Sequence, residues 1–580
     1  MIRFAANHLG NMADSWETAY ELSLDVYNTL AEMSMRFASS EEALDAAIQV
    51  DRHANILEDK IRAQIIFLRH KVQGSDRDYL GGIESIRNIL LDYGIKFPKN
   101  IIPGQQFLQN RRLKARLEGN VEVFLTLPKL DERNIDEKRT QTILNLLSCV
   151  LEYTMFDKKL KDLHFYATTR ILNISMKEGC TSDTALAMVR YGGHLGSLGH
   201  AKDSKEWGEV ATKLVDCFPR KIGSQHGIIR SWVTFGLLAA SVPLYKLLDP
   251  ILELNCYALK YGDVTGGIMT WVGYSYTYIS VGLPLDPLDS DIISFSKEAR
   301  QFGIPETVRV LLPIFRQTIH NLKVLQPIPT LLKGDIFDQE KELKKFKDAG
   351  LKMTLRDINS FRLMLACIYQ DWEAAEELIS ALEPFLYTDR WVLRRHVYLV
   401  FMGYASVALG ETTKRKKGHK FRQLGKKIIK IFKDKLKNGS SDALPIIMML
   451  QAIESPSKKR FDEAIRTTAR LGLVHYSAVL YENAGLFFMQ ESKTGWAEYH
   501  LAEATKLYRE WGAHGKAMQM LDKYECLHSS PLYQNHSGGN IHGRSRFSSE
   551  SFAHMRVPIT SSLTRRASLT GPAHSYDEKE

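Results

Sequence analysis

The chain has 580 residues, of which 44% are hydrophobic and 25% are charged, the proportions of an ordinary globular protein. Its net charge of +10 is modest for this length, which fits either several domains or one solenoid of repeats. The six cysteines are widely scattered, without a CxxC pair or a paired histidine. This pattern argues against a disulfide framework or a zinc site and favours a reducing compartment.

The first residues do not read as a secretion signal. Polar side chains, among them Asn7 and Asn11, interrupt the apolar run that a signal peptide requires. A second apolar stretch, 228–247, contains Arg230 and Lys246, so it predicts buried helices rather than a membrane span. We therefore expect a cytoplasmic protein.

The N-terminal part predicts two helical pairs. The first covers 15–54, with Ser40 as the expected N-cap of its second helix. The second covers 59–94 and ends in a glycine C-cap at Gly94. Two prolines follow, the second being Pro103, and are expected to stop the helical pattern.

From Gln105 onward the helical pattern hardly stops. A broad apolar face over 143–153 predicts a central helix. The glycine-rich 185–200 predicts a closely packed helix followed by a turn at 201–203, because its glycines fit no phosphate-binding loop. The same order, a polar turn before a helix of small residues, recurs at 369–378.

The clearest repeat is 471–524. Small and aromatic residues recur at helical spacing on either side of a polar turn, 491–495. The residues that define the two faces are Ala478, Tyr481, Ala484, Gly485 and Phe488, then Ala497, Leu501, Ala504, Leu507 and Tyr508. This is the plan of a tetratricopeptide-type repeat. With no strand pattern of useful length, the sequence predicts an all-α superhelical solenoid of such hairpins.

Two interruptions of the helical-repeat pattern define the expected division of the chain into domains. A Pro-rich loop at 326–336 separates a first block of repeats, 1–325, from a second block, 337–526. The remaining 527–580 is rich in serine, arginine and histidine and has few large apolar residues. Such a tail cannot bury enough surface to offset its ordering entropy, so we expect it to be disordered.

Sequence motifs that would indicate catalysis are missing. There is no HExxH, no GxSxG and no protein-kinase HRD or DFG set. We therefore expect no catalytic residue, no cofactor, no metal and no enzymatic activity.

The sharpest local feature is the basic segment 414–437. Twelve lysines and arginines face a single acid, Asp434, and an apolar stripe from Phe421 to Leu436 runs through them. Such a helix can bind an anionic membrane, a calmodulin-like partner or nucleic acid; alternatively, it is a repeat helix whose stripe packs in the solenoid. The predicted partner surface comprises Lys414, Arg415, Lys416, Lys417, Lys426, Lys427, Lys430 and Lys433.

The tail contains a candidate modification site. Ser568 follows two arginines, the arrangement that basophilic protein kinases favour, and Ser549 lies in a looser version of it. Phosphate at Ser568 would add about −1.5 to −2 charge beside those arginines.

The run of repeats resembles the helical-repeat region of very large signalling proteins. The closing YREWGAHGKAMQML is the most specific match, and the resemblance covers most of 15–524. In that family a serine/threonine kinase-like domain and an AAA/STAND-type ATPase precede the repeats, and GAF and sensor histidine kinase domains follow them. This chain has no phosphate loop, kinase catalytic set or phospho-acceptor histidine box, so it looks like a free-standing or truncated repeat region.

Three functions follow as hypotheses. The first is a non-enzymatic scaffold in signalling, including two-component signalling, that binds a protein or peptide partner on the superhelix surface. The second is a fragment of an ATPase/histidine-kinase signalling protein whose catalytic domains lie outside this chain. The third is a basic peripheral module that binds anionic membrane or nucleic acid through 414–437.

Overall fold

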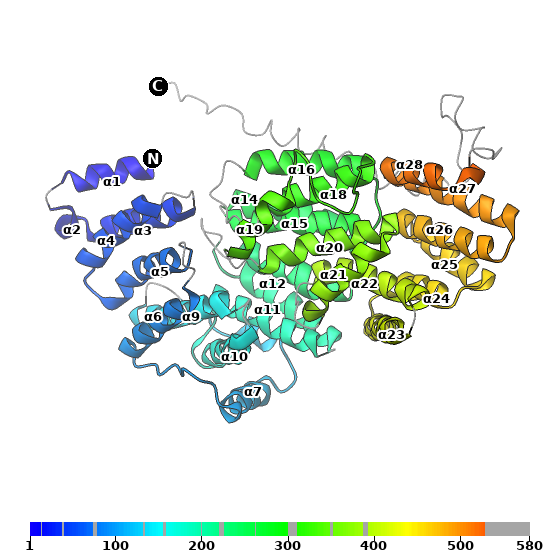
Figure 1. Cartoon of the computed structure of the whole chain (residues 1–580). Helices are drawn as coiled ribbons and strands as arrows, with labels where there is room; N and C mark the ends of the chain where they lie inside the picture. The colour runs from blue at the N-terminus through cyan, green and yellow to red at the C-terminus, as the bar shows by residue number, and fades with distance from the viewer. Residues whose placement is uncertain are drawn as a thin grey trace, which may run out of the picture.

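The computed structural model describes residues 1–12, 14–36, 40–73, 78–130, 134–154, 158–198, 200–219, 226–261, 263–299, 310–348, 352–386, 392–413 and 415–527. Over these ranges the protein is all-α, a curved stack of helical hairpins (Figure 1). The described residues contain no strand, only isolated bridges between Lys129 and Cys180 and between Lys333 and Asp338. The predicted all-α solenoid is confirmed, whereas the expected disorder of the tail concerns residues that, from 528 onward, lie outside the described ranges.

The first helices form a small layer of their own at the N-terminal end. They are α1 (Ile2–Gly10), α2 (Ser15–Thr18), α3 (Tyr20–Arg36), α4 (Ser40–His53) and α5 (Leu57–Gln73). Fully buried Ala31, Ala43 and Ala47 let α3 and α4 pack closely. Helix α5 contributes to two apolar clusters: Ala63 and Ile66 belong to the N-terminal one and Ile61 and Leu68 to the next.

The second layer surrounds a central helix, as the broad apolar face over 143–153 predicts. Its helices are α6 (Tyr79–Asp92), α7 (Pro103–Leu117), α8 (Val123–Thr126), α9 (Ile135–Thr154), η1 (Lys158–Leu160), α10 (Lys161–Glu178), α11 (Ser182–Ser197) and α12 (Ala201–Asp216). Gly94 has a φ of +71° just beyond α6, which confirms the predicted glycine C-cap. Pro103 does not stop a helix; it begins α7, because a proline at the first helical position gives up no hydrogen bond.

The glycine-rich helix α11 packs as predicted, but its turn lies elsewhere. A Cβ at Gly192 would meet the carbonyl of Ser204 at 3.2 Å and Cβ of Trp207 at 3.2 Å, so this glycine lets α11 and α12 approach closely. The expected turn at 201–203 is the first turn of α12 instead. Leu198 is the C-cap of α11, so the break comes before Ala201.

The middle of the chain begins with an irregular apolar segment. Its helices are α13 (His226–Trp232), the π-helix η2 (Val233–Leu237), η3 (Leu238–Ala240), η4 (Leu244–Leu247), α14 (Leu248–Lys260), α15 (Val264–Ser280), α16 (Leu285–Ala299), α18 (Leu311–Lys323) and α19 (Gln339–Asp348). The stretch 228–247 is therefore several short helical segments, as its polar residues predict. Residues 324–338, which contain the predicted interblock loop, have no helix, and the division into two blocks there stays a prediction.

The last helices repeat the hairpin most regularly. They are α20 (Lys352–Tyr369), α21 (Trp372–Leu382), η5 (Glu383–Phe385), α22 (Val392–Thr412), α23 (Arg415–Lys437), α24 (Ala443–Glu454), α25 (Lys458–Arg470), α26 (Val474–Gln490), α27 (Thr494–Trp511), α28 (His514–Lys523) and η6 (Glu525–Leu527). The polar turn predicted at 369–372 is present. Asp371 caps α21 by accepting a hydrogen bond from the Ala374 amide, at 3.1 Å.

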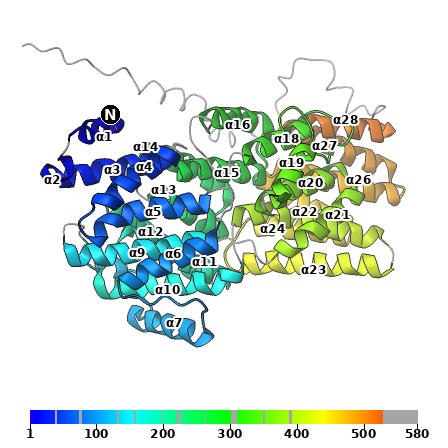
Figure 2. The same cartoon turned by 60° about the vertical axis from the view of Figure 1, so that its left-hand side comes forward.

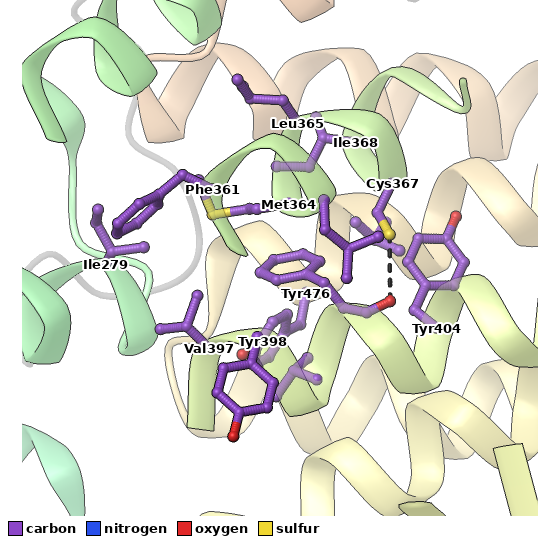
Figure 3. Packing of buried hydrophobic residues seen from close by; sticks show 14 of the residues in the cluster. Ile279, Phe361, Met364, Leu365, Cys367, Ile368, Val397, Tyr398, Tyr404 and Tyr476 are labelled. Atoms are coloured by element: carbon purple, nitrogen blue, oxygen red, sulfur yellow. Dashed lines mark hydrogen bonds between the residues drawn. The ribbon is translucent and has the colours of Figure 1, made fainter. Parts of the chain in front are cut away.

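The C-terminal helices fold back on the middle of the stack. Helix α28 packs against α18 and α20, and α15 packs against α22. One apolar cluster therefore runs from Phe235 to Leu527. Figure 3 shows part of it, where the Phe361 ring of α20 lies beside Ile279 of α15 and Val397 and Tyr398 come from α22. The stack is thus more closed than an array in which each repeat contacts only its neighbours.

Candidate functional site

Helix α23 is amphipathic, and its apolar side is used in the fold. Phe421, Leu424, Ile428 and Phe432 follow one another at gaps of three or four residues, which places them on one side of a helix. All four are buried against neighbouring helices. The apolar stripe therefore packs inside the solenoid from Phe421 to Phe432, the arrangement expected of a repeat helix, while Leu436 at its end is 36% exposed.

The approach of α22 and α23 depends on small residues. A Cβ at Gly425 of α23 would lie 2.9 Å from Cγ1 of Val407 in α22. Near the other end of the contact, the Arg422 guanidinium donates a hydrogen bond to the Gly410 carbonyl. These contacts fix the rotation of α23 about its own axis, and so they fix which residues it presents to solvent.

The outer side of α23 is rich in exposed lysines, most of them between residues 426 and 437. We call the lysine face the set Lys416, Lys426, Lys427, Lys430, Lys433 and Lys437, all of them exposed. Asp434 is the one acid in the helix. Helix α23 has 23 residues, so it is about 34 Å long. Figures 1 and 2 show it at the lower edge of the molecule.

Two lysines near the start of α23 pair with acids of neighbouring elements. The Lys417 ammonium lies 2.5 Å from a carboxylate oxygen of Glu376 in α21. The Lys420 ammonium lies 3.4 Å from a carboxylate oxygen of Glu383 in η5. Both lysines are predominantly exposed, so each pair contributes little to stability.

The predicted partner surface is thus placed as follows. Lys416, Lys426, Lys427, Lys430 and Lys433 lie on the lysine face. The remaining three predicted residues do not form part of it: Lys417 is ion-paired, Arg415 has a side chain that is not described, and Lys414 lies outside the described residues. Ser549 and Ser568, the predicted phosphorylation sites, also lie outside the described residues.

Lys435 shows that not every lysine of α23 reaches solvent. It is half-buried, and its ammonium lies 5.1 Å from the Phe432 ring centroid. Burial, with a smaller contribution from Arg395, lowers the pKa of Lys435 to about 7, and Asp442 opposes this change. Asp442 itself accepts a hydrogen bond from the Leu244 amide at 2.9 Å, so this polar group connects α24 to the start of η4.

The sequence reasoning missed a buried ion pair in the last repeat. The Lys516 ammonium of α28 lies 2.7 Å from a carboxylate oxygen of Glu482 in α26, and both side chains are at most 1% exposed. The Tyr508 hydroxyl donates to the other Glu482 oxygen at 2.9 Å, and Lys516 also donates to Gln519 at 2.9 Å. The network joins three helices of the C-terminal repeat, and its position in the core makes it structural. The sequence signals a charge within an otherwise apolar helix face, but it does not show that these two charges pair.

A second buried cluster lies between α20 and α22. The Arg394 guanidinium lies 3.1 Å from Asp357, and the Arg356 guanidinium lies 3.5 Å from the same carboxylate. All three side chains are at most 8% exposed, and the Arg356 guanidinium also lies 5.6 Å from the Phe385 ring centroid. This cluster, too, holds helices together.

Metal-ligating and thiol groups were the remaining candidates for chemistry in the described part of the chain. No cluster of three or more histidine, cysteine or acidic side chains there could hold a metal. The thiols of Cys149 and Cys180 are buried, and burial raises the pKa of each to about 12. Such thiols are poor nucleophiles at neutral pH. The lysine face is therefore the surface with the clearest binding chemistry.

No described helix is long and apolar enough to span a lipid bilayer. No protein-family model matches the sequence, and neither does any curated protein.

Proposed function

We propose that this protein is a non-enzymatic interaction scaffold that binds an acidic segment of a partner protein on the lysine face of α23. The observation that carries the proposal is the division of α23 into a buried apolar side and an exposed side with several lysines and one acid. A rigid repeat stack holds this row of charges in a fixed geometry, and repeat proteins typically bind through extended surfaces of this kind.

The chemistry of the face favours protein over lipid or nucleic acid. Membrane-surface helices insert an apolar side, but Phe421, Leu424 and Ile428 are buried. Single-stranded nucleic acids are typically held by aromatic side chains that stack on bases, and the lysine face contains none. A row of flexible ammonium groups matches a run of aspartates and glutamates in a partner.

The test is binding of a labelled poly-glutamate peptide to the full chain, followed by fluorescence anisotropy. Substituting three lysines of the face (Lys426→Gln, Lys430→Gln and Lys433→Gln) should weaken binding about tenfold, because each exposed charge pair contributes up to about 1 kcal/mol. Added salt should weaken the wild-type complex more than that of the variant.

A matched control removes the same charge from another exposed helix. Lys341→Gln, Lys344→Gln and Lys347→Gln change three exposed lysines of α19. If both triple variants weaken binding equally, net charge rather than the lysine face is responsible and the proposal fails. Stronger competition by duplex DNA or phosphatidylserine vesicles than by acidic peptide would also overturn it.

The place of this scaffold in signalling rests on the resemblance of its repeats to those of multidomain kinase/ATPase proteins. The alternative, that the chain belongs to a longer protein of that kind, is open to a direct test. The genomic DNA on both sides should be read for a phosphate loop or a GAF pattern. Finding either in the same reading frame would replace the free-standing scaffold with the longer protein.

A further inference from the structure

Helix α7 has a firmly attached inner side. Leu113 and Leu117 are buried against the second layer, and Gln109 is 8% exposed. The Asn173 side-chain amide donates to the Gln109 carbonyl at 3.0 Å, and the Arg116 guanidinium donates to the Asn173 carbonyl at 3.0 Å. These contacts hold α7 against α10, and Figures 1 and 2 both show it as the outermost helix at the lower edge of the molecule.

The outer side of α7 and the residue before it expose large apolar side chains. Phe107 is 65% exposed, Leu108 is 51% exposed and Ile102 is 62% exposed. Ile102 is the extended residue before the helix, whose first residue is Pro103, and Phe107 and Leu108 are neighbours in its second turn. Isolated exposed leucines are common on protein surfaces, whereas two adjacent large apolar side chains on the outer side of a projecting helix, with a third just before it, suit a contact surface.

Basic residues follow these apolar residues by about one turn. Arg111, Arg112 and Lys114 are exposed, and the stretch from Tyr93 through Leu117 contains no aspartate or glutamate. The positive end of the helix dipole lies at the start of α7, at Pro103, which is also the end that carries the exposed apolar side chains. The outer side of α7 therefore combines apolar groups with purely positive charge.

We propose that this α7 surface, made of Ile102, Phe107, Leu108, Arg111, Arg112 and Lys114, binds the headgroup region of an anionic membrane. The three apolar side chains enter the bilayer surface while the arginines and the lysine pair with lipid phosphates and carboxylates. A projecting convex helix suits a flat, deformable surface. It differs from the lysine face of α23, whose apolar side chains are buried, and it is independent of the function proposed above.

The test is co-sedimentation of the full chain with vesicles of phosphatidylcholine alone and with vesicles that also contain phosphatidylserine. The wild-type chain should sediment with the phosphatidylserine vesicles only. Phe107→Ser with Leu108→Ser keeps every charge and should lower the apparent vesicle affinity about tenfold or more. Arg111→Gln, Arg112→Gln and Lys114→Gln should lower it as well and should remove most of its dependence on salt.

Three controls distinguish binding by this surface from nonspecific adsorption of the protein to vesicles. Leu198→Ser removes a leucine of similar exposure, 60%, at the end of α11 and should leave vesicle binding unchanged. Phe107→Trp should preserve binding. Circular dichroism of each variant checks that the helices remain folded.

The proposal is overturned if the wild-type chain does not bind phosphatidylserine vesicles, if the serine variant binds as the wild type does, or if only the α23 variant loses binding. Loss of poly-glutamate binding instead of vesicle binding in the α7 variants would also overturn it, by assigning the surface to a protein partner.

Discussion

His475 is a buried histidine whose environment disfavours its charged form. It is 4% exposed, and neither ring nitrogen has a hydrogen-bond partner within the described residues. Its imidazole lies against Gly282. A Cβ added to Gly282 would lie 2.0 Å from Nδ1 of His475, and the φ of Gly282 is +69°. Burial lowers the pKa of His475 to about 3. His396, also buried, has its pKa lowered to about 3 by burial and, to a smaller extent, by Lys435 and His475.

This environment predicts acid sensitivity of the C-terminal helices. A histidine with a folded-state pKa below its unfolded value of 6.5 binds protons more readily when unfolded, so stability is full above that pH and falls toward pH 3. Between pH 6.5 and 4.5 the loss should be about 2 to 3 kcal/mol from His475. Hydrogen exchange of α26 over this pH range measures it, after correction for the intrinsic exchange rate.

His475→Leu should flatten that pH dependence, and His8→Leu, which changes an exposed histidine, should leave it as in the wild type. Equal slopes in the wild type and the His475 variant would contradict the assignment.

Single residues also show where sequence reasoning stops. The glycine cap at Gly94 and the aspartate cap at Asp371 could be predicted, because a cap is set by residues within one turn of it. The pair of Glu482 and Lys516 could not, because its partners are 34 residues apart and meet only once three helices have packed. The partner of a buried charge can be read from the sequence only when that partner is local.

The helix pair α26 and α27 depends on one close approach. A Cβ at Gly485 would lie 2.7 Å from Cγ of Leu501 and 3.3 Å from the Ala497 carbonyl. In the same hairpin, Gly495 has nothing within 4 Å of an added Cβ. Two glycines of one hairpin therefore have opposite environments.

Gly485→Ala should lower the free energy of unfolding of the C-terminal helices by about 1 to 3 kcal/mol, because it overpacks the contact. Gly495→Ala should leave it unchanged or raise it by up to about 1 kcal/mol, because alanine favours helix over glycine. Urea denaturation followed by circular dichroism compares the two. A destabilisation of equal size in both variants would mean that the approach at Gly485 is not what holds the hairpin.

At the element level, periodicity predicted the helices well and their exposed sides less well. The hairpin at 474–511 and the buried segment 228–247 were recognised because apolar spacing records which side faces the core. For α23, the same spacing fitted both a membrane helix and a repeat helix, and only the packing against α22 decides that its stripe is buried. For α7, its exposed phenylalanine and leucine went unnoticed because the spacing of apolar residues does not tell which of two faces is covered.

The whole molecule has three apolar clusters of unequal extent. The N-terminal cluster spans Ala6 to Ile66, the second spans Ile61 to Leu237, and the third spans Phe235 to Leu527. The first meets the second along α5, and the second meets the third at η2. Because α28 packs back on α18 and α20, the third cluster is closed on itself while the first is held along one side only.

Unfolding should therefore proceed in stages from the N-terminal end. We expect amides of α1–α4 to exchange faster than those of α20–α22 in hydrogen-exchange mass spectrometry. Ala31→Asp, at a position that is 0% exposed, should release α1–α4 and leave exchange in α20–α22 as in the wild type. Exchange of all helices in one concerted step, with or without the substitution, would contradict this arrangement.

The ion pair of Glu482 and Lys516 sets an order of events during synthesis. The ribosome releases the carboxylate first, and its ammonium partner follows 34 residues later. At about 5 to 20 residues per second, the carboxylate waits roughly 2 to 7 seconds before the pair can form. Until then, closure of α26 on α27 gives the carboxylate the Tyr508 hydroxyl as a donor but not its ammonium partner. The packing of α28 that completes the final repeat therefore has to wait for the synthesis of Lys516.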